Sequence, residues 1–441
     1  MKLLIISIIK KDKTQSQGRY RGFMMIEIML AFSLFTIFTI SIYSLTSSFQ
    51  SMKIWSLKEL SKLENSVHAM DSFASSTTLS MYGNDSQIFT ADPFSATKSN
   101  LIDSWGGSTC SPRIDFDQSK ITLYPQGVFL GTGNSSTDVK VKNSIAYLTS
   151  DSSTLSQPDF FIVDAHNPES PGIISSLQTG PGLSAITVAG PYAYVANTSS
   201  LSQLQIIDMS DRMHPFILSQ IKIPLPTAST TAPIASSIFY KNGFVYLGTN
   251  KWNGPELSIV DVSNPLSPVI VGNFETNTLI NDIYINKNTV YLATSDSIQM
   301  RVLDISDKTN PISVFSFSPS GRQTQEGKAL EYFEQRLGLG RTVGGFNNVS
   351  NHEAFIFATS SNTDFVSSDI SGGVYGLLFR FPNIFLLSHS PGHEFQVFSS
   401  TLQTKIFDMS LGSEPVKMAC DWSNLFFATG NSQGLVILYL K

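Results

Sequence analysis

The feature that most constrains the fold is a strand-rich unit that recurs along the chain. In four strong copies, an apolar strand ends in Asp164, Asp208, Asp261 or Asp304, and a proline closes the turn that follows. The copies read DFFIVDAHNPESP (159–171), LQIIDMSDRMHP (204–215), LSIVDVSNPLSP (257–268) and MRVLDISDKTNP (300–311). A second short strand precedes each one, at 146–149, 193–196, 245–248 and 290–293. One unit therefore holds four strands joined by turns.

The aspartate that ends each of these strands has a simple structural interpretation. An Asp side chain can accept hydrogen bonds from backbone N–H groups just downstream in a turn. The proline that follows cannot donate to a strand ladder and so ends the pairing. We therefore expect the four aspartates to make turns. A catalytic or metal-binding role is the less favoured alternative.

Three weaker copies extend the repeat. Their strands lie at 355–359, 395–399 and 435–439, and preceding strands lie at 336–340, 383–387 and 424–428. Equivalent positions are about 46 residues apart on average, and a repeat of roughly 40–50 residues with four strands is typical of β-propellers. We predict a mainly β fold, a seven-bladed β-propeller with four-stranded blades, over residues 119–441.

The last copy is one strand short, because the sequence ends after its third strand. An open blade edge invites aggregation. The strand-like segment 121–133 (ITLYPQGVFLGTG) lies before the first copy and can supply the missing outer strand. The four strong copies resemble the LVIVD-repeat family of bacterial surface propellers, whereas the last three lack its Asp–Ser–Asn–Pro turn.

A basic stub and an apolar run begin the chain. Residues 1–22 carry six Lys and Arg residues against one acid, which is +5, so the remainder of a chain of net charge −5 carries −10. Residues 23–45 are apolar except for Glu27 and are long enough to cross a bilayer. A plain signal anchor or a secretory signal peptide would be the simple interpretation. The long spacer KKDKTQSQGRYRG and a lone membrane carboxylate, which is costly without a partner, argue against both.

The segment RGFMMIEIMLAFSLF (21–35) resembles the N-terminal signal of type IV pilins and pseudopilins. The resemblance implies that a prepilin peptidase cuts between Gly22 and Phe23, that the new amine of Phe23 is N-methylated, and that Glu27 is the Glu of the fifth mature position. In a filament, that carboxylate neutralises the N-terminal amine of a neighbouring subunit. The resemblance therefore makes Gly22 and Phe23 the cleavage site, and Phe23 and Glu27 the residues of filament assembly.

An amphipathic pattern continues beyond the predicted membrane span. Apolar residues recur every three or four positions from Ile54 to Phe73, with Lys and Glu between them. This predicts a helix that packs against another surface, in preference to a free stalk. We therefore divide the chain into a leader (1–22), a long α-helix (23–75, with the transmembrane part at about 23–45), a connector (76–118) and the propeller (119–441).

The two cysteines are far apart in sequence but are expected to be neighbours in the ring. Cys110 lies just before the proposed closing strand, and Cys420 lies on the first strand of the last blade. In an oxidising compartment such a pair predicts a disulfide, although two buried thiols are the alternative.

Few residues point to chemistry. The sequence contains no nucleophile elbow, HExxH, P-loop or Cys-x-x-Cys motif. His389 and His393 flank a Pro–Gly turn beside Glu394, and we interpret them as loop residues rather than a metal site. The glycine-rich stretch 338–345 is expected to pack tightly near the axis. We predict no cofactor and no metal. For the alternative of a tethered propeller hydrolase or lyase, the acids to inspect at the axial mouth are Asp282, Asp364, Glu331 and Glu334.

Ligand contacts are expected in the longest loops, because propellers bind partners where loops from several blades converge. The long loops are 223–236, 318–328 and 344–353. Candidate ligand residues in or beside the last two are Arg322, Arg336, Arg341, Asn347, Asn348, Asn351 and His352. The alternative is that these are variable surface loops without a ligand.

Composition supports a surface protein that binds partners. Only 14% of residues are charged, against about 25% in soluble domains, and acids outnumber bases, which argues against nucleic-acid binding. We expect a bacterial minor or tip pilin-like protein, first in the cytoplasmic membrane and then on an extracellular filament, that presents a propeller for adhesion and is not an enzyme. Its expected partners are prepilin peptidase, other pilin subunits, the membrane and a surface ligand or receptor. A pseudopilin of a secretion or DNA-uptake machine is the alternative.

Overall fold

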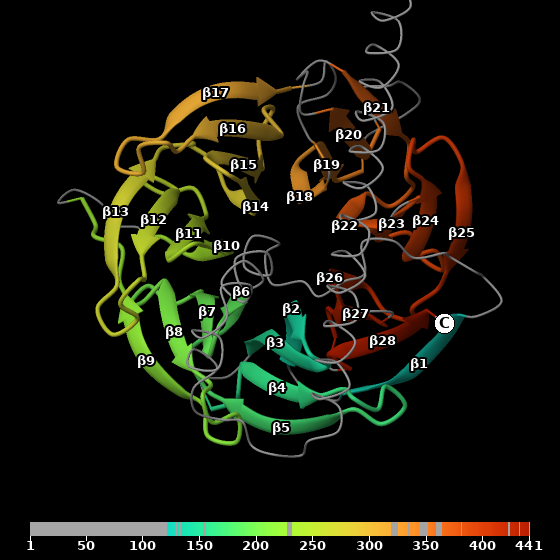
Figure 1. The fold of residues 1–441 in the computed structure, drawn as a ribbon, viewed down its shortest axis with the longest axis horizontal. Coiled ribbons are helices and arrows are strands. Elements are labelled where there is room, and N and C mark those ends of the chain that lie inside the picture. Colours follow the sequence, from blue (N-terminus) through green and yellow to red (C-terminus); the bar gives the residue numbers. More distant parts are fainter. Residues whose placement is uncertain are drawn as a thin grey trace, which may run out of the picture. The chain divides into compact units, whose positions relative to one another are not determined.

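The described part of the computed structural model is a ring of seven four-stranded antiparallel sheets (Figure 1). The structure describes residues 121–128, 130–131, 134–152, 156–226, 232–318, 325–333, 335–343, 352–358, 364–380, 382–421, 424–431 and 433–440. The predicted seven-bladed propeller of four-stranded blades is therefore confirmed. The predicted leader, long helix and connector lie outside the described residues.

The first four blades are each built from four consecutive strands, ordered from the axis outward. Blade 1 contains β2 (Asn134–Lys142), β3 (Ile145–Ser152), β4 (Phe160–Asp164) and β5 (Gly172–Leu177). Blade 2 contains β6 (Leu183–Ala189), β7 (Tyr192–Asn197), β8 (Leu204–Asp208) and β9 (Phe216–Ile221). Blade 3 contains β10 (Ala235–Lys241), β11 (Phe244–Thr249), β12 (Leu257–Asp261) and β13 (Val269–Phe274). Blade 4 contains β14 (Ile280–Asn286), β15 (Thr289–Thr294), β16 (Met300–Asp304) and β17 (Ile312–Phe317).

The remaining blades follow the same plan, but the last takes one strand from the other end of the propeller. Blade 5 contains β18 (Gly327–Phe333), β19 (Arg336–Arg341), β20 (Ala354–Ala358) and β21 (Phe365–Ser368). Blade 6 contains β22 (Val374–Arg380), β23 (Asn383–Ser388), β24 (Phe395–Ser399) and β25 (Lys405–Met409). Blade 7 contains β26 (Pro415–Asp421), β27 (Asn424–Thr429), β28 (Leu435–Leu440) and, as its outer strand, β1 (Ile121–Val128).

The sequence repeat corresponds to the third strand of each blade. The strong copies end β4, β8, β12 and β16 at their aspartates, and the weaker copies are β20, β24 and β28. The proposed closing strand is also confirmed, because β1 pairs antiparallel with β28 from Ile121↔Leu440 to Val128↔Leu435. The sequence ends and the ring closes at the same place.

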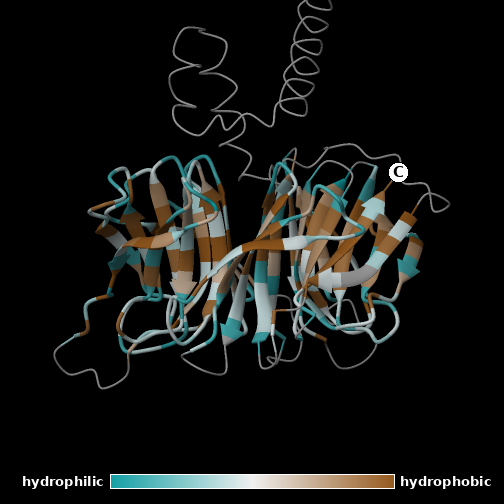
Figure 2. Ribbon diagram, turned by 90° about the horizontal axis from the view of Figure 1, so that it is seen from below, coloured by the Kyte–Doolittle hydropathy of each residue, from teal (hydrophilic) through white to brown (hydrophobic). Residues whose placement is uncertain are grey.

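The core lies between the blades. The second and third strands are buried almost throughout, and side chains of neighbouring blades form shared apolar clusters. Phe317 of blade 4, for example, packs edge-on against Phe355 and Phe357 of blade 5, with ring centroids 5.3 and 4.8 Å away. Apolar residues accordingly fill the strands, whereas the loops at both faces are more polar (Figure 2). Burial of this kind supplies most of the stabilisation of such a fold.

The antiparallel order gives the ring two distinct faces. The turns between first and second strands, and those between third and fourth strands, lie at one face, which we call the Asp-turn face because it carries Asp164, Asp208, Asp261 and Asp304. The loops between second and third strands, and the links between blades, lie at the other face, which we call the loop face. The described ends of the three long loops named above, at 223–226, 232–236, 318, 325–328 and 352–353, lie at the loop face.

A bulge near the start of each inner strand joins one blade to the next. In blades 1 to 4 the extra residue donates a side-chain hydrogen bond of 2.6–2.7 Å to the carbonyl oxygen that begins the next inner strand. The donors are Thr137, Ser184, Ser236 and Asn281, and the acceptors are Leu183, Ala235, Ile280 and Gly327. Blades 5 to 7 have Lys328, Tyr375 and Val416 at this position. The strong sequence repeats therefore correspond to the blades with this link.

Among the described residues, none belongs to a helix long and apolar enough to cross a membrane. The predicted span at 23–45, with Gly22, Phe23 and Glu27, lies outside those residues.

Candidate functional site

The inner strands enclose an axial cavity of about 160 Å³. The residue after the bulge occupies the same register position in all seven blades, and all seven of these residues line the cavity. In blade order they are Asp138, Ala185, Ser237, Asp282, Ala329, Gly376 and Lys417. We call this set the axial ring. Four of its members are small, which leaves room at the axis for the three charged side chains.

The two aspartates of the axial ring have equivalent hydrogen bonds. Asp138 accepts the backbone N–H groups of Val139 (2.8 Å) and of Ile186 in the next blade (3.0 Å). Asp282 accepts those of Ile283 (3.0 Å) and of Leu330 in the next blade (2.9 Å). Each carboxylate therefore fastens one inner strand to the next.

Lys417 lies across the axis from blade 7 to blade 4, where its Nζ is 3.4 Å from the Asp282 carboxylate. Burial disfavours the charged amine, but the carboxylates of Asp282 and Asp138 outweigh it and raise the pKa of Lys417. Asp138 also pairs with Lys140 at 3.2 Å. The two aspartates and two lysines thus neutralise one another around the axis.

Glu331 is the third carboxylate of the cavity and lies two residues after Ala329, the member of the axial ring in blade 5. Burial raises the pKa of Glu331 to about 7, with Arg380 and Lys140 opposing and Asp282 reinforcing the shift. Burial likewise lowers the pKa of Arg380 to about 10, and Glu331 opposes that shift. Arg380 is 4% exposed and contacts the carbonyl of Phe379 and Sγ of Cys420. Glu331 and Arg380 therefore offset each other's charge inside the ring.

The acids predicted for an axial catalytic site are only partly brought together. Asp282 and Glu331 line the cavity, whereas Asp364 is exposed just before the outer strand β21, and Glu334 lies outside the described residues. Sequence reasoning missed Asp138, which is the equivalent of Asp282 three blades earlier. Both aspartates follow a bulge residue, Thr137 or Asn281, and the bulge is visible only in the strand pairing, so the sequence held no signal for Asp138.

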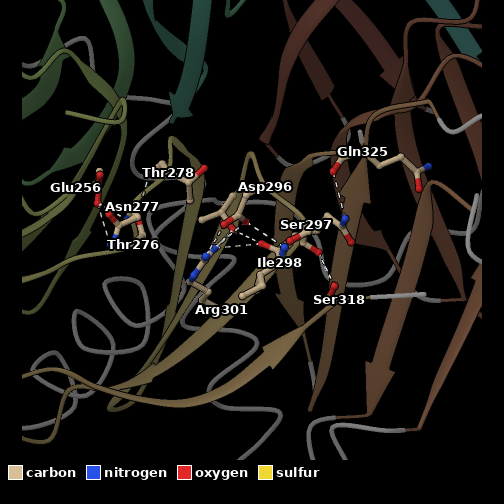
Figure 3. A network of polar contacts seen from close by, with 12 residues as sticks. Glu256, Thr276, Asn277, Thr278, Asp296, Ser297, Ile298, Arg301, Ser318 and Gln325 are labelled. Carbon is tan, nitrogen blue, oxygen red and sulfur yellow. Dashed lines mark hydrogen bonds and ion pairs between the residues drawn. The ribbon is translucent and has the colours of Figure 1, made fainter. Parts of the chain in front are cut away.

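On the loop face, a buried polar residue just before the third strand fastens the link that leaves the same blade (Figure 3). Glu256 is fully buried and accepts Thr276 N–H (2.8 Å), the Thr276 hydroxyl (3.1 Å) and Asn277 N–H (2.9 Å). The other members of this set, which we call the clamp residues, accept backbone N–H groups 17–20 residues downstream. They are Asp159, Gln203, Glu353 and Glu394.

Clamp residues were not predicted from the sequence. Their signal is an Asp, Glu or Gln directly before the apolar run of the third strand, visible in six of the seven copies at 159, 203, 256, 299, 353 and 394. Glu353 acts in the same way, because it accepts a hydrogen bond from Ile370 N–H at 2.8 Å. These residues hold the loop face in shape and are not free for a ligand.

A second polar cluster orders the β15–β16 loop on the same face (Figure 3). Arg301 forms a two-point ion pair with Asp296, at 3.0 and 2.6 Å, and donates to Thr294 Oγ1 at 2.6 Å. Ser318 donates to the carbonyl of Ser297 at 2.6 Å. The geometry of a two-point Arg–carboxylate pair rigidifies this loop.

The structure separates the candidate ligand residues. Arg341 is fully buried at the end of β19, where it donates to the carbonyl of His352 (3.0 Å) and lies 4.6 Å over the Phe355 ring. Burial lowers the pKa of Arg341 to about 10, with Glu353 opposing. Arg341 therefore belongs to the blade interior. Arg336 lies at the opposite end of β19, on the Asp-turn face.

His352 remains on the loop face, where its Nδ1 is 2.8 Å from the Ser367 hydroxyl. Arg322, Asn347, Asn348 and Asn351 lie outside the described residues. The ligand role of these loops stays a prediction.

The two neighbouring histidines and Glu394 do not converge on one point. His389 is 3.0 Å from the Pro415 carbonyl and stacks on Tyr375, with ring centroids 3.6 Å apart. His393 pairs with Asp408 at 3.2 Å, and Glu394 acts as a clamp residue. Within the described part of the chain, no group of three or more His, Cys, Asp or Glu residues is placed to hold a metal ion.

The repeat aspartates make the expected turns. Asp164, Asp208, Asp261 and Asp304 each accept the backbone N–H two residues downstream, at 2.8–3.0 Å. The glycines of β19 also behave as predicted, because an added methyl group on Gly338 would lie 2.6 Å from Leu377, and one on Gly340 would lie 2.6 Å from Val374 O. Blade 6 thus packs directly on the backbone of blade 5.

The loop face also exposes large aliphatic side chains. Leu201 is 71% exposed, and Val343, Ile234 and Leu225 are 55%, 43% and 39% exposed. Leu201 and Ile234 border an open groove whose other lining residues are mostly Ser, Thr and Gln of blade 2 and its links, with Gly180, Pro181 and Ala232. Leu201 and Ile234 thus bring two exposed aliphatic side chains to one groove.

Cys420 is buried on the inner strand β26, as predicted. Its proposed partner, Cys110, lies outside the described residues, so the disulfide stays a prediction.

Comparison with known proteins agrees with the architecture. The LVIVD repeat family matches residues 184–221, 234–276 and 281–318, which are blades 2, 3 and 4. The chain therefore contains LVIVD repeats, although they cover well under half of it. A chain in the crystal structure of the mitotic checkpoint complex is 11% identical with a TM-score of 0.53, over 75% of this chain and 94% of that one.

Two further solved structures are similar at a TM-score of 0.49. They are the computationally designed Ika8 protein (11% identity, 72% of this chain and 100% of that one) and the WD40 β-propeller domain of Doa1 (10% identity, 72% and 96%). No curated protein sequence matches the chain. At these identities the likeness concerns the fold alone.

Proposed function

We propose that the protein is a minor or tip pilin-like surface protein whose propeller binds a partner. The observation that carries this proposal is the junction RGFMMIEIM (21–29), in which Gly22 precedes Phe23 and Glu27 follows within a long apolar run, on the same chain as a closed propeller. The proposed route is cleavage after Gly22 by prepilin peptidase, residence in the cytoplasmic membrane, and extraction into an extracellular filament.

The propeller's role in this proposal is recognition, and not catalysis. Two of the three axial carboxylates, Asp138 and Asp282, are committed to backbone N–H groups and to Lys140 and Lys417. The third, Glu331, is buried, and its charge is offset by Arg380. Catalytic acids and bases need a free, tuned proton site within reach of a substrate. The exposed aliphatic side chains of the loop face support partner binding instead.

Where the chain enters the ring supports the same assignment. Ile121 pairs with Leu440, so the chain enters and leaves the propeller at the Asp-turn face of blade 7. The segment before Ile121 therefore attaches at the face opposite the long loops. A propeller of this size on every subunit would crowd a helical filament, which favours a minor or tip position.

The proposal is tested on the exported protein in its native host. N-terminal sequencing of the exported form should give Phe23, and immunogold labelling should place the propeller on sheared filaments. Glu27→Ala should leave processing intact but reduce filament incorporation, whereas Glu64→Ala, beyond the apolar run, serves as the matched control. Any other N-terminus would refute the pilin assignment. A Phe23 N-terminus with label confined to the cell envelope would instead assign a pseudopilin of a secretion or DNA-uptake machine.

A further inference from the structure

We propose that β1 is a force-bearing clasp, by which we mean a single strand that closes the ring and also carries any pull on the chain before Ile121, which we call the tether. This inference rests on the proposed function only in that the tether is under load. β1 is the one propeller strand that is separated in sequence from the rest of its blade, since it precedes β2 while its partners are β26 to β28. Any pull transmitted from residues before Ile121 reaches β1 first.

The pairing of β1 is concentrated at the end where the pull arrives. Four consecutive residues, Ile121 to Tyr124, pair with Leu440 to Ile437. The register is then irregular until Val128 pairs with Leu435. Pro125 has no N–H to donate. The first four pairs therefore hold the strand against the tether.

At the loop face, the far end of β1 is fitted tightly against the start of β28. A methyl group added to Gly127 would lie 1.6 Å from the Leu435 carbonyl oxygen. Val128 and Leu130 are buried in an apolar cluster shared with blade 1. The close approach of two backbones requires glycine at 127 and fixes the register of the whole strand.

The direction of the load decides how this clasp resists. β28 pairs with β27 along its length, from Asn424↔Tyr439 to Ala428↔Leu435, and the chain connects the two strands at the Leu435 end, whereas β1 is pulled from its Ile121 end. A pull between the tether and the loop face therefore slides the two antiparallel strands past each other and loads all their hydrogen bonds together. A pull between residue 121 and the C-terminal residue 440 instead opens the pairs one at a time, starting with Ile121↔Leu440.

Release of β1 is expected to be a discrete step, because other contacts hold blade 7 in place. Ser136 of blade 1 lies 2.7 and 2.6 Å from the carbonyl oxygens of Thr429 and Gly434. Lys417 remains paired with Asp282 across the axis. The released segment, residues 121 to 133, has a contour length of about 45 Å. Its departure uncovers the edge of β28, LVILYL, which has no charged residue to deter pairing with another strand.

The test is single-molecule force measurement on the full chain in detergent, with a peptide handle inserted directly before Ile121. The second handle is placed after Lys441 in one version and in the exposed loop at Gly430–Asn431 in the other. We expect a first event in both versions that frees residues 121 to 133, with a gain in extension equal to their contour of about 45 Å less the span they already cover in the folded ring, at a severalfold higher force with the loop handle. A cysteine pair at Thr122 and Tyr439, which are partners in the ladder, should abolish this extension until reductant is added.

Matched glycine variants provide a second measurement. Gly127→Ala should lower the release force, whereas Gly172→Ala on the outer strand β5, where a methyl group meets nothing within 4 Å, should leave it unchanged. Equal forces in the two pulling geometries, or a first event that releases a whole blade, would overturn the proposal. These measurements do not depend on filament assembly, so failure of the clasp and failure of the pilin assignment are distinguishable.

Discussion

Removing the carboxylate of the clamp residue Glu256 tests whether the loop face is held from within. In Glu256→Ala, the buried N–H of Thr276 and the N–H of Asn277 lose their acceptor, while the Thr276 hydroxyl keeps its bond to the Thr278 carbonyl at 2.9 Å. A hydrogen bond to a charged group contributes about 1.5–3 kcal/mol. Losing two such bonds is partly offset, because the Glu256 carboxylate no longer has to be desolvated on folding. The net loss in the free energy of unfolding is about 3 kcal/mol.

Glu256→Gln is the matched control, because nature already uses an amide at the equivalent position. Gln203 accepts the N–H of Ile223 through Oε1 at 2.8 Å. We therefore expect Glu256→Gln to cost less than about 1 kcal/mol. For a propeller of about 320 residues, a 3 kcal/mol loss lowers Tm by about 4–5 °C.

The measurement is denaturant unfolding of wild type and both variants, with the transition slope compared to establish that the folded states are equally compact. Equal stability of the Ala and Gln variants would refute the reasoning, because it would mean that the acceptor oxygen contributes nothing. A changed slope would show that the loop face had opened rather than lost two bonds.

Three further predictions concern the axis and the cysteines. Lys417→Met leaves the Asp282 carboxylate without its cation and should lower stability by about 1–2 kcal/mol, since the pair is half-buried. Lys417→Arg should recover most of this loss, and an equal loss in both variants would contradict the cross-axis pair with Asp282. The raised pKa of Glu331 means that the folded protein binds this proton more tightly than the unfolded chain does. Stability should therefore fall as the pH rises from about 4.5, the ordinary pKa of a Glu, to about 7, its pKa in the folded protein. Glu331→Gln should flatten that part of the profile, and an unchanged profile would assign the slope to another group. Alkylation and intact-mass measurement should label neither Cys110 nor Cys420 without reductant and both with it; two labels without reductant would exclude the disulfide.

The ring could be predicted because its repeat has a turn-forming Asp at the same position in each strong copy. Each strong copy ends a strand with an Asp whose side chain closes the next turn, as the bond from Asp261 to Ser263 N–H at 2.9 Å illustrates. The closing strand could be predicted because the last copy lacked a partner. Both inferences depend on local residues and on counting strands, and neither requires knowledge of packing.

The axial ring could not be predicted by alternation alone. One extra residue in each inner strand shifts every later side chain to the other face of the sheet. Nothing in the letters around Thr137 marks it as that residue. The bulge, and with it the axial position of Asp138, follows from how the strand meets its neighbours in three dimensions.

The burial of Arg341 could have been predicted from strand alternation. Arg341 stood near other polar residues in the sequence, which suggested a shared ligand surface. Along RLGLGR, however, Arg341 shares a face with Leu337 and Leu339, which are both buried. Strand alternation therefore outweighs closeness in sequence at this position.

The bonds that run from each bulge residue to the next inner strand have an evolutionary consequence. Each of blades 1 to 4 contributes a donor to the blade after it, and blades 2 to 5 each offer an acceptor to the blade before. A tandem duplication of one such unit would carry both halves of the junction with it. New blades could thus be added within this stretch without new matching mutations, whereas a copy of one of the last three blades, with Lys328, Tyr375 or Val416 at this position, would not bring this donor with it.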